Sequence, residues 1–287
     1  MAGTLYLVAT PIGNLEDITL RALRVLREAD LIACEDTRTS GTLLRHFEID
    51  TPVTSYHKFN ENEKGDELVG RLLLGTNIAL ITDAGMPAVS DPGEILVRKC
   101  MENHIAVTAI PGPSACVTAL AMSGADTRRF AFEGFLPAEN REKREVLERL
   151  VSETRTILLY EAPHRLARTL QTLAETLGEE RGISLCRELT KKYESVERMT
   201  IGEALRRTES KPPRGEYVLV IDGKSEKELA AEEAARWESV DIPAHVAQYE
   251  AQGLDHKAAM KAVARDRGIS RRDVYAALLE AQEGEQA

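Results

Sequence analysis

Five short stretches of the chain place reactive or unusually small residues directly after apolar runs. Two of them, Glu35-Asp-Thr-Arg38 and His57-Lys-Phe-Asn60, carry side chains that can accept, hold or donate a proton. The other three are Thr10-Pro-Ile-Gly13, Asp83-Ala-Gly85 and Pro111-Gly-Pro-Ser114. Small residues let a ligand approach the backbone closely. Together the five stretches indicate a ligand site that includes groups suited to acid–base chemistry.

The apolar runs before these stretches predict the elements that must position them. Helical patterns separate the runs, and alternating strands and helices imply parallel βαβ units, which bind ligands at the carboxyl ends of their strands. We therefore expect all five stretches on one edge of one sheet. A purely structural alternative exists for each single loop: Ser90 or Asp91, for example, could cap the next helix, with Pro92 at its first position. The predicted strands are 5–9, 31–34, 53–56, 77–82 and 105–110.

Further along the chain, the patterns predict a second α/β unit and a helical tail. Strands are expected at 131–135, 156–160, 183–186 and 217–221, with a helix from Pro163 that stops at Gly178. A charged linker helix and three short helices follow, and Ser270 and Asp273 have the spacing of a capping box. The expected domains are 1–125 (α/β), 126–223 (α/β), 224–240 (linker) and 241–287 (helical).

Composition excludes several classes of protein. The 287 residues carry a formal net charge of −10, which argues against a histone-like binder. Four scattered cysteines and six histidines show neither a disulfide framework nor metal-ligand spacing, so no metal is predicted. Prolines interrupt the uncharged stretch 105–125, which favours a buried strand and helix over a membrane span. A soluble cytoplasmic protein is the expectation, without a signal peptide.

Seven motifs, in order between about residues 3 and 223, resemble those of one family closely. They are Thr10-Pro-Ile-Gly-Asn14, Cys34-Glu-Asp-Thr-Arg38, Thr82-Asp-Ala-Gly-Met-Pro-Ala-Val-Ser-Asp-Pro-Gly93, Ile110-Pro-Gly-Pro-Ser-Ala115, Glu133-Gly-Phe-Leu-Pro137, Tyr160-Glu-Ala-Pro-His-Arg165 and Cys186-Arg-Glu-Leu-Thr190. This set is similar to that of the ribosomal RNA methyltransferases in the tetrapyrrole methylase-like (class III) group of S-adenosylmethionine enzymes.

The resemblance implies the fold, the reaction and the assembly. It implies an α/β fold of two domains that hold S-adenosyl-L-methionine in the cleft between them. A small all-α, helix-turn-helix-like domain follows at the C-terminus. The implied reaction is 2′-O-methylation of a cytidine in 16S rRNA, at the decoding centre of the small ribosomal subunit, by a homodimer. Carried over by position, the cofactor contacts are Pro11, Asp83, Ala84, Gly85, Met86, Ser114, Ala115, Tyr160, Glu161 and Leu189.

The candidates for catalysis are carboxylates near the second predicted strand. The family position at its end matches Glu35, so Glu35 or Asp36 is the candidate base or hydroxyl-orienting group, with Arg38 and His57 on nearby loops. In the alternative interpretation, Asp36 and Arg38 only pair with each other. Glu161 also has an alternative role, because a carboxylate beside a helix N-terminus is favourable without catalysis.

Two locally basic segments are the candidates for RNA binding. Each offsets the acidic background and could contact phosphates, although charge runs are often only solvated faces. The tail could also be a helical bundle that buttresses a dimer. Two other functions stay open: methylation of a corrinoid or porphyrin precursor, and DNA binding by a regulator without enzymatic activity. The candidate RNA contacts are Arg206, Arg207, Lys211, Arg265, Arg267, Arg271 and Arg272.

Overall fold

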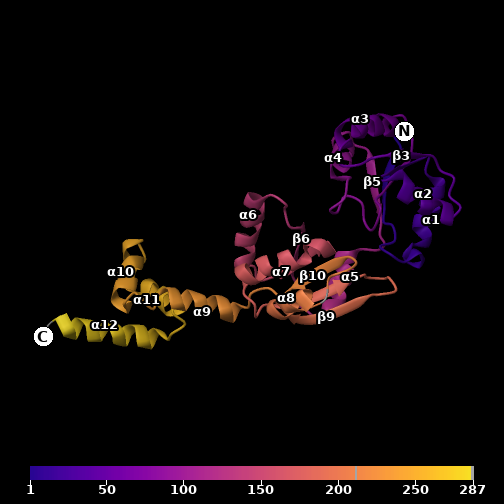
Figure 1. The fold of residues 1–287 in the computed structure, drawn as a ribbon. Coiled ribbons are helices and arrows are strands. Elements are labelled where there is room, and N and C mark those ends of the chain that lie inside the picture. Colours follow the sequence, from indigo (N-terminus) through magenta and orange to yellow (C-terminus); the bar gives the residue numbers. More distant parts are fainter. Residues whose placement is uncertain (211, 286–287) are drawn as a thin grey trace. The chain divides into compact units, whose positions relative to one another are not determined.

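Residues 1–210 and 212–285 are described by a computed structural model of the chain, in which two compact units form (Figure 1). The first unit comprises Met1–Leu147 and Thr156–Asp222 and holds both β-sheets. The second comprises Glu148–Arg155 and the chain from Gly223 onward, and its main part is helical. No helix within the described residues is long and apolar enough to span a membrane.

The first sheet is fully parallel, with the strand order β3-β2-β4-β1-β5, which confirms the expected βαβ units. Because the strands are parallel, their carboxyl ends meet at one edge, and the five stretches follow those ends. All residues of β2 and β4 are buried, as expected for central strands of a sheet covered on both faces. The strands are β1 (Thr4–Val8), β2 (Leu31–Cys34), β3 (Val53–Ser55), β4 (Ile78–Ile81) and β5 (Ala106–Ile110).

Helices cover both faces of this sheet. One apolar cluster joins Leu5 to Leu68 of α3 and Leu96 of α4, and a second cluster joins the opposite face to α1 and α2. Side-chain oxygens of the residues before α1 and α2, Thr19 and Asp36, cap these two helices. The helical elements here are η1 (Leu15–Asp17, a 3₁₀ turn), α1 (Leu20–Glu28), α2 (Thr37–His46), α3 (Glu61–Leu73) and α4 (Glu94–Glu102).

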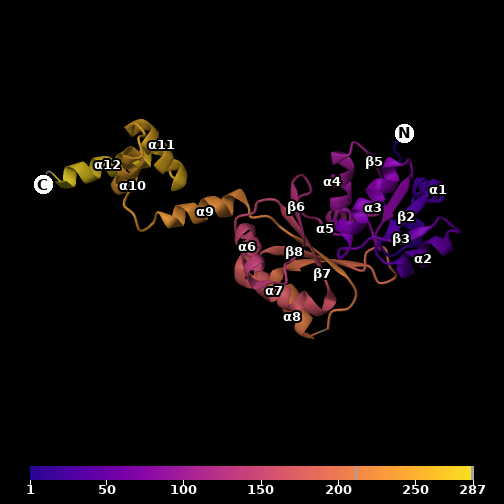
Figure 2. The same ribbon diagram turned by 90° about the horizontal axis from the view of Figure 1, so that it is seen from above.

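The second sheet is mixed, with the order β6-β7-β10-β8-β9. Residues such as Leu158 and Val218 pack against α5 on one face of the sheet. Helices α7 and α8 lie on the other face (Figure 2), to which the alternate residues of each strand point. The sequence did not predict the edge strand β9, because its mostly polar residues form no apolar run. The elements are α5 (Ala115–Ser123), β6 (Phe130–Phe135), α6 (Asn140–Val151), β7 (Thr156–Glu161), α7 (Pro163–Leu177), β8 (Gly182–Arg187), β9 (Ser195–Thr200), α8 (Ile201–Ser210) and β10 (Tyr217–Ile221).

The second unit contains the linker helix and the three expected short helices. Val246, Val263 and Val274 belong to its buried core. The predicted capping box is confirmed, because the backbone of Asp273 donates to the Ser270 hydroxyl and the backbone of Ser270 donates to the Asp273 carboxylate. The helices are α9 (Glu226–Arg236), α10 (Ile242–Ala251), α11 (His256–Asp266) and α12 (Arg271–Glu285).

Candidate active site

A cavity of about 430 Å³ lies where the carboxyl edge of the first sheet meets the strand ends of the second. Its size falls in the range of ~300–1,000 Å³ that is typical of small-molecule sites. The side of the first sheet contributes Ile12, the turn after β4, residues 89–91 and the start of α5. The second sheet contributes the ends of β6, β7 and β8 and the start of β10.

Most of the residues that the resemblance assigns to the cofactor line this cavity. Pro11 and Asp83 do not line it, although each directly precedes a residue that does. Pro11 is buried and Asp83 is exposed. Direct contact of these residues with a cofactor stays a prediction. The assigned residues that line the cavity are Ala84, Gly85, Met86, Ser114, Ala115, Tyr160, Glu161 and Leu189.

Backbone hydrogen bonds join two of the loops that form the cavity. Thr10 and Gly85 exchange two backbone hydrogen bonds, at 2.9 and 3.1 Å. The buried hydroxyl of Thr10 also donates to the carbonyl of Thr82. Gly85 adopts φ +88°, a left-handed conformation that favours glycine. The small residues after β1 and β4 therefore serve the local backbone as well as any ligand.

Two helices begin at the cavity without a side-chain cap from the described residues. Ser114 is the N-cap residue of α5 and Ala162 is that of α7, and neither side chain accepts a backbone hydrogen bond from its helix. The first backbone N–H groups of a helix have no partner within the helix, and they favour a negatively charged group nearby. The start of α5 can therefore receive an anionic part of a ligand, whereas Pro163 gives the first position of α7 no N–H and the Glu161 carboxylate already accepts from the backbone of Ala162.

Asp91 is a cavity-lining carboxylate that the sequence analysis named only in a structural alternative, as a possible helix cap. That interpretation is wrong, because α4 begins at Glu94 with Gly93 at its N-cap and has no side-chain cap. Burial is the main cause that raises the pKa of Asp91 to about 6, and the nearby charge of Glu35 adds to the effect. A carboxylate with this pKa can accept a proton near neutral pH.

The loop around Asp91 is held in an unusual conformation. Ala88 and Ser90 adopt left-handed φ values of +67° and +68°, which are uncommon for residues other than glycine. The carboxylate of Glu61 anchors the end of the loop by accepting a hydrogen bond from the backbone of Gly93, at 3.0 Å. Backbone strain of this kind is concentrated at functional sites. Nothing in the residue types of the loop signals this conformation in advance.

The predicted catalytic residues lie near the edge of the first sheet but do not line the cavity. Glu35 accepts a hydrogen bond from the Thr82 hydroxyl at 3.1 Å, and its charge acts on Asp91. Asp36 caps α2 and pairs with Arg38, and hydrogen bonds from Arg38 lower the pKa of Asp36 to about 2. His57 lies in the turn before α3, where its backbone N–H donates to the Asn60 side chain.

Glu161 is fully engaged in local structure. It is 2% exposed, accepts hydrogen bonds from the backbone of Ala162 and the hydroxyl of Thr169, and lies 3.5 Å from the Arg165 guanidinium. These partners tie the end of β7 to the first turns of α7. The geometry matches the structural alternative for this carboxylate, and its role toward a cofactor stays a prediction.

The predicted RNA contacts differ in how far they are already paired. Arg206 and Arg207 of α8 form ion pairs with Glu179 and Glu197. Arg267 donates to the carbonyl of Val240 and to the ring of His245, inside the second unit. These three guanidinium groups therefore already have acceptors within the protein.

The three remaining arginines of this set lie in the last turn of α11 or at the start of α12. Arg265 pairs with the buried carboxylate of Asp266. Arg271 and Arg272, in the first turn of α12, are exposed. Lys211 lies outside the described residues. The role of all these residues in RNA binding stays a prediction.

Comparison with known proteins places this architecture in a family. The family model of tetrapyrrole (corrin/porphyrin) methylases matches residues 4–205. This chain belongs to that family. Among its curated relatives, the ribosomal RNA small subunit methyltransferase I of Halalkalibacterium halodurans is 48% identical, over 95% of this chain and 93% of the relative. The protein of the same name from Synechocystis is 45% identical over 97% of this chain and 98% of the relative.

Family membership confirms the expected class of enzyme. The chain is an S-adenosylmethionine-dependent methyltransferase with the two α/β sheets of the tetrapyrrole methylases, followed by helices. The alternative of a regulator without enzymatic activity is therefore excluded.

Solved structures of tetrapyrrole methylases and related enzymes share the fold. A cobalt-precorrin-4 methyltransferase superposes with a TM-score of 0.57 at 18% identity, covering 76% of this chain and 94% of that chain. A diphthine synthase superposes with a TM-score of 0.62 at 14% identity, covering 77% and 90%. At these identities the likeness shows the two-sheet fold and leaves the substrate open.

Proposed function

We propose that this tetrapyrrole methylase family member transfers a methyl group from S-adenosylmethionine to the ribose 2′-hydroxyl of a cytidine in 16S rRNA of the small ribosomal subunit. The observation that carries the proposal is the extent of the similarity. Curated relatives named for small-subunit ribosomal RNA match 95–97% of this chain, and therefore include its helical tail. The likeness to the cobalt-precorrin-4 methyltransferase covers only 76%.

The cavity fits S-adenosylmethionine by the chemistry of its walls. Ile12, Leu189 and Val218 offer apolar surface for an adenine ring. The start of α5 offers N–H groups for the carboxylate of the methionine part. When bound, the cofactor supplies a methyl group already activated by its sulfonium sulfur. These features support the cofactor, and its contacts with individual residues are proposals.

The protein's part in the reaction is to align the ribose hydroxyl and to remove its proton. The bond from the hydroxyl oxygen to the methyl carbon forms as the bond from that carbon to sulfur breaks. We assign the departing proton to Asp91, because Asp91 lines the cavity and its pKa of about 6 leaves it mostly ionised at neutral pH. The hydrogen bond between Glu35 and Thr82 holds a second carboxylate near Asp91, so Glu35 is a positioning residue.

Asp91 replaces both carboxylates that the sequence suggested as the base. With a pKa of about 2, and with Arg38 donating to both of its carboxylate oxygens, Asp36 is a weak proton acceptor. Asp36 also accepts from the backbone of Arg38, which gives it a structural role at the start of α2. We therefore place Asp36, Arg38 and His57 outside the reacting centre.

The family resemblance also supports a homodimer that acts in the cytoplasm on the small subunit. Light scattering of the purified protein tests the dimer, which requires twice the chain mass of 31.7 kDa. The helical tail is the proposed RNA-docking part, because Arg271 and Arg272 present exposed charge at the start of α12.

A direct assay of methyl transfer tests the proposed function. Purified protein is incubated with methyl-labelled S-adenosylmethionine and either 30S subunits or uroporphyrinogen III. We expect label in 16S rRNA and none in the porphyrin precursor. Transfer to the precursor alone would support a small-molecule methylase instead, and the absence of transfer to either would contradict the proposed substrate.

A further inference from the structure

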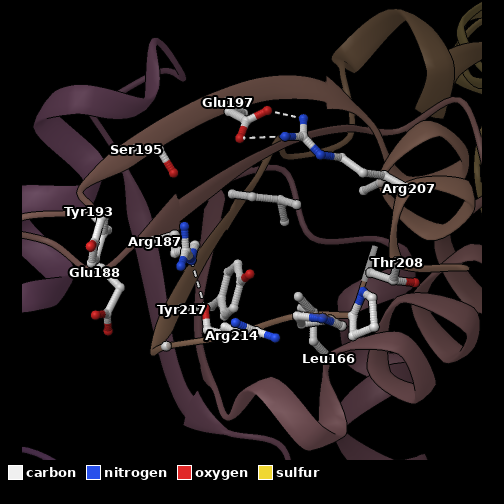
Figure 3. Close-up of a pocket in the computed structure, with 15 residues that line it drawn as sticks. Leu166, Arg187, Glu188, Tyr193, Ser195, Glu197, Arg207, Thr208, Arg214 and Tyr217 are labelled. Carbon is white, nitrogen blue, oxygen red and sulfur yellow. Dashed lines mark hydrogen bonds and ion pairs between the residues drawn. The ribbon is translucent and has the colours of Figure 1, made fainter. Parts of the chain in front are cut away.

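A second, larger cavity of about 710 Å³ lies beside the second sheet of the first unit (Figure 3). Its walls come from β8, β9, the start of β10 and the two helices α7 and α8. Tyr217, the first residue of β10, lines both this cavity and the candidate active site. The two cavities open on opposite faces of the sheet, because Cys186 and Val218 line the candidate active site while Leu185 and Arg187 line this cavity. They meet around the strand ends at Tyr217, where a bound polymer can pass from one face to the other.

Two guanidinium groups that line this cavity form no ion pair within the described part of the chain. They belong to Arg187, the last residue of β8, and to the exposed Arg214. Arg187 donates through Nε to the backbone carbonyl of Arg214 at 2.6 Å, which leaves its terminal nitrogens for another acceptor. Such groups at the wall of a cavity suit a phosphate, whose oxygens match their planar donor geometry.

The carboxylates of the cavity already have cationic partners. Glu197 accepts two hydrogen bonds from Arg207. Glu188 accepts hydrogen bonds from Lys191 Nζ and from the backbone of Glu216, each at 3.0 Å. Three arginines and two glutamates line the cavity, so it carries an excess of positive charge in a chain whose net charge is −10. That local excess favours an anionic occupant.

Aromatic side chains accompany the two arginines. Tyr193 is 64% exposed at the cavity wall, and the ammonium of Lys192 lies 5.6 Å from the centre of its ring. Tyr217 pairs with Arg187 across the sheet, and Figure 3 shows it close to both Arg187 and Arg214. Proteins bind unpaired RNA bases by stacking them on aromatic and guanidinium planes. The cavity thus combines the two kinds of group that bind a single-stranded nucleotide.

We propose that this cavity binds a nucleotide of the substrate RNA that neighbours the methylated one. Arg187 and Arg214 hold its phosphate, and Tyr193 stacks on its base. The inference rests on the proposed function, because it takes the neighbouring cavity as the site of methyl transfer. It identifies the substrate as a locally unpaired strand that passes around the end of the sheet at Tyr217, with one nucleotide in each cavity.

Two substitutions test the subsite with little effect on the fold. Arg214→Ala removes an exposed guanidinium but keeps the backbone carbonyl that accepts from Arg187. Tyr193→Leu removes an exposed aromatic face. Arg129→Ala is the matched control, because Arg129 is exposed and directly precedes β6, at the strand ends opposite the cavities. The dissociation constant for 30S subunits is measured by co-sedimentation over a series of salt concentrations.

We expect weaker RNA binding in both test variants and unchanged binding in the control. Tyr193→Leu should weaken binding by about tenfold, a typical stacking contribution. Arg214→Ala should also reduce the slope of log K against log salt by about 0.7, the value for one single-strand phosphate contact. Affinity for S-adenosylmethionine should stay within about twofold of the parent protein, since neither residue lines the cofactor cavity. Parent-like binding of both variants at every salt concentration would overturn the subsite.

A crosslinking experiment locates the bound nucleotide. A photoreactive phenylalanine analogue replaces Tyr193, and the crosslinked rRNA position is mapped. We expect a crosslink to a nucleotide next to the methylated cytidine, and one confined to a distant rRNA helix would contradict the proposal. Tight binding of free cytidine monophosphate that Arg214→Ala abolishes, without any change in 30S affinity, would assign the cavity to a free nucleotide instead. Binding is measured without methyl transfer, so the subsite and the proposed function can fail separately.

Discussion

At the scale of single residues, Asp91 is the group on which the proposed chemistry depends. Asp91→Asn removes the proton acceptor while keeping the shape of the side chain. A positioned base contributes about 10²–10⁴-fold, so single-turnover methyl transfer to 30S subunits should fall by a factor in that range. Cofactor affinity, measured by calorimetry, should barely change. A rate close to that of the parent protein would remove Asp91 from the reaction.

The same substitution should stabilise the folded protein at neutral pH. The pKa of Asp91 lies at about 6, above its ordinary value of 3.8, so the native state holds this proton over a pH range where the unfolded chain has released it. The free energy of unfolding therefore falls as pH rises from about 4 to 6. Asparagine carries no such proton, and denaturant titrations of Asp91→Asn should show a smaller fall. An unchanged pH dependence would contradict the raised pKa.

Glu35 should act through the pKa of Asp91. Its negative charge raises the pKa of Asp91, so Glu35→Gln should lower that pKa. The rise of kcat/KM with pH would then move to lower pH, while kcat well above the pKa would change little. Glu94→Gln is the control, because Glu94 is exposed and pairs with Arg98. If kcat/KM of Glu35→Gln rises over the same pH range as that of the parent protein, Glu35 does not influence the pKa of the base.

At the scale of elements, the sequence predicted the parallel sheet and the edge at which its loops gather, but not which of those loops line the cavity. Apolar runs and helical periods depend on burial, which residue types reveal directly. Asp36 and Asp91 both stand between a strand and a helix, and either could cap the helix that follows. Only the folded backbone shows that Asp36 caps α2 while Asp91 faces the cavity. The loop before Asp91 contains the left-handed residues Ala88 and Ser90, whose conformation the sequence does not signal.

The turn after β4 offers a test of the cofactor position. A substitution at Gly85 would strain the backbone, because its φ is +88°. Ala84→Leu avoids that problem and adds bulk at a residue that lines the cavity. It should weaken S-adenosylmethionine binding by about tenfold or more in calorimetry, since overfilling a packed site costs about 1–3 kcal/mol. Ala106→Leu, an exposed site at the amino end of β5, is the control. Equal affinity in both variants would move the cofactor away from this turn.

The start of α12 is the element proposed to dock RNA. Arg271→Ala combined with Arg272→Ala removes two exposed charges and leaves the Ser270–Asp273 capping box in place. If each arginine contacts a duplex phosphate, the salt slope of 30S binding should become shallower by about 1.8, at about 0.9 per contact. Co-sedimentation over a salt series measures the slope. An unchanged slope would favour the alternative that the tail only buttresses the protein.

At the scale of the whole molecule, we assign methyl transfer to one cavity and RNA binding to a second cavity and the helical unit. The first cavity has the walls for a cofactor and a carboxylate for a proton, and the second has arginines beside tyrosines. The family shares the two-sheet fold with enzymes named for small-molecule substrates. The second cavity and the helical tail, which we propose bind RNA, should therefore distinguish this chain from family members that act on small molecules.

The most direct test of the central claim is a map of ribose methylation in 16S rRNA at nucleotide resolution. The map is made from cells that lack this protein, and again after they receive either the parent gene or the Asp91→Asn variant. We predict that one cytidine loses its 2′-O-methyl group, regains it with the parent protein and does not regain it with the variant. An unchanged methylation map in the cells that lack the protein would contradict the proposed function.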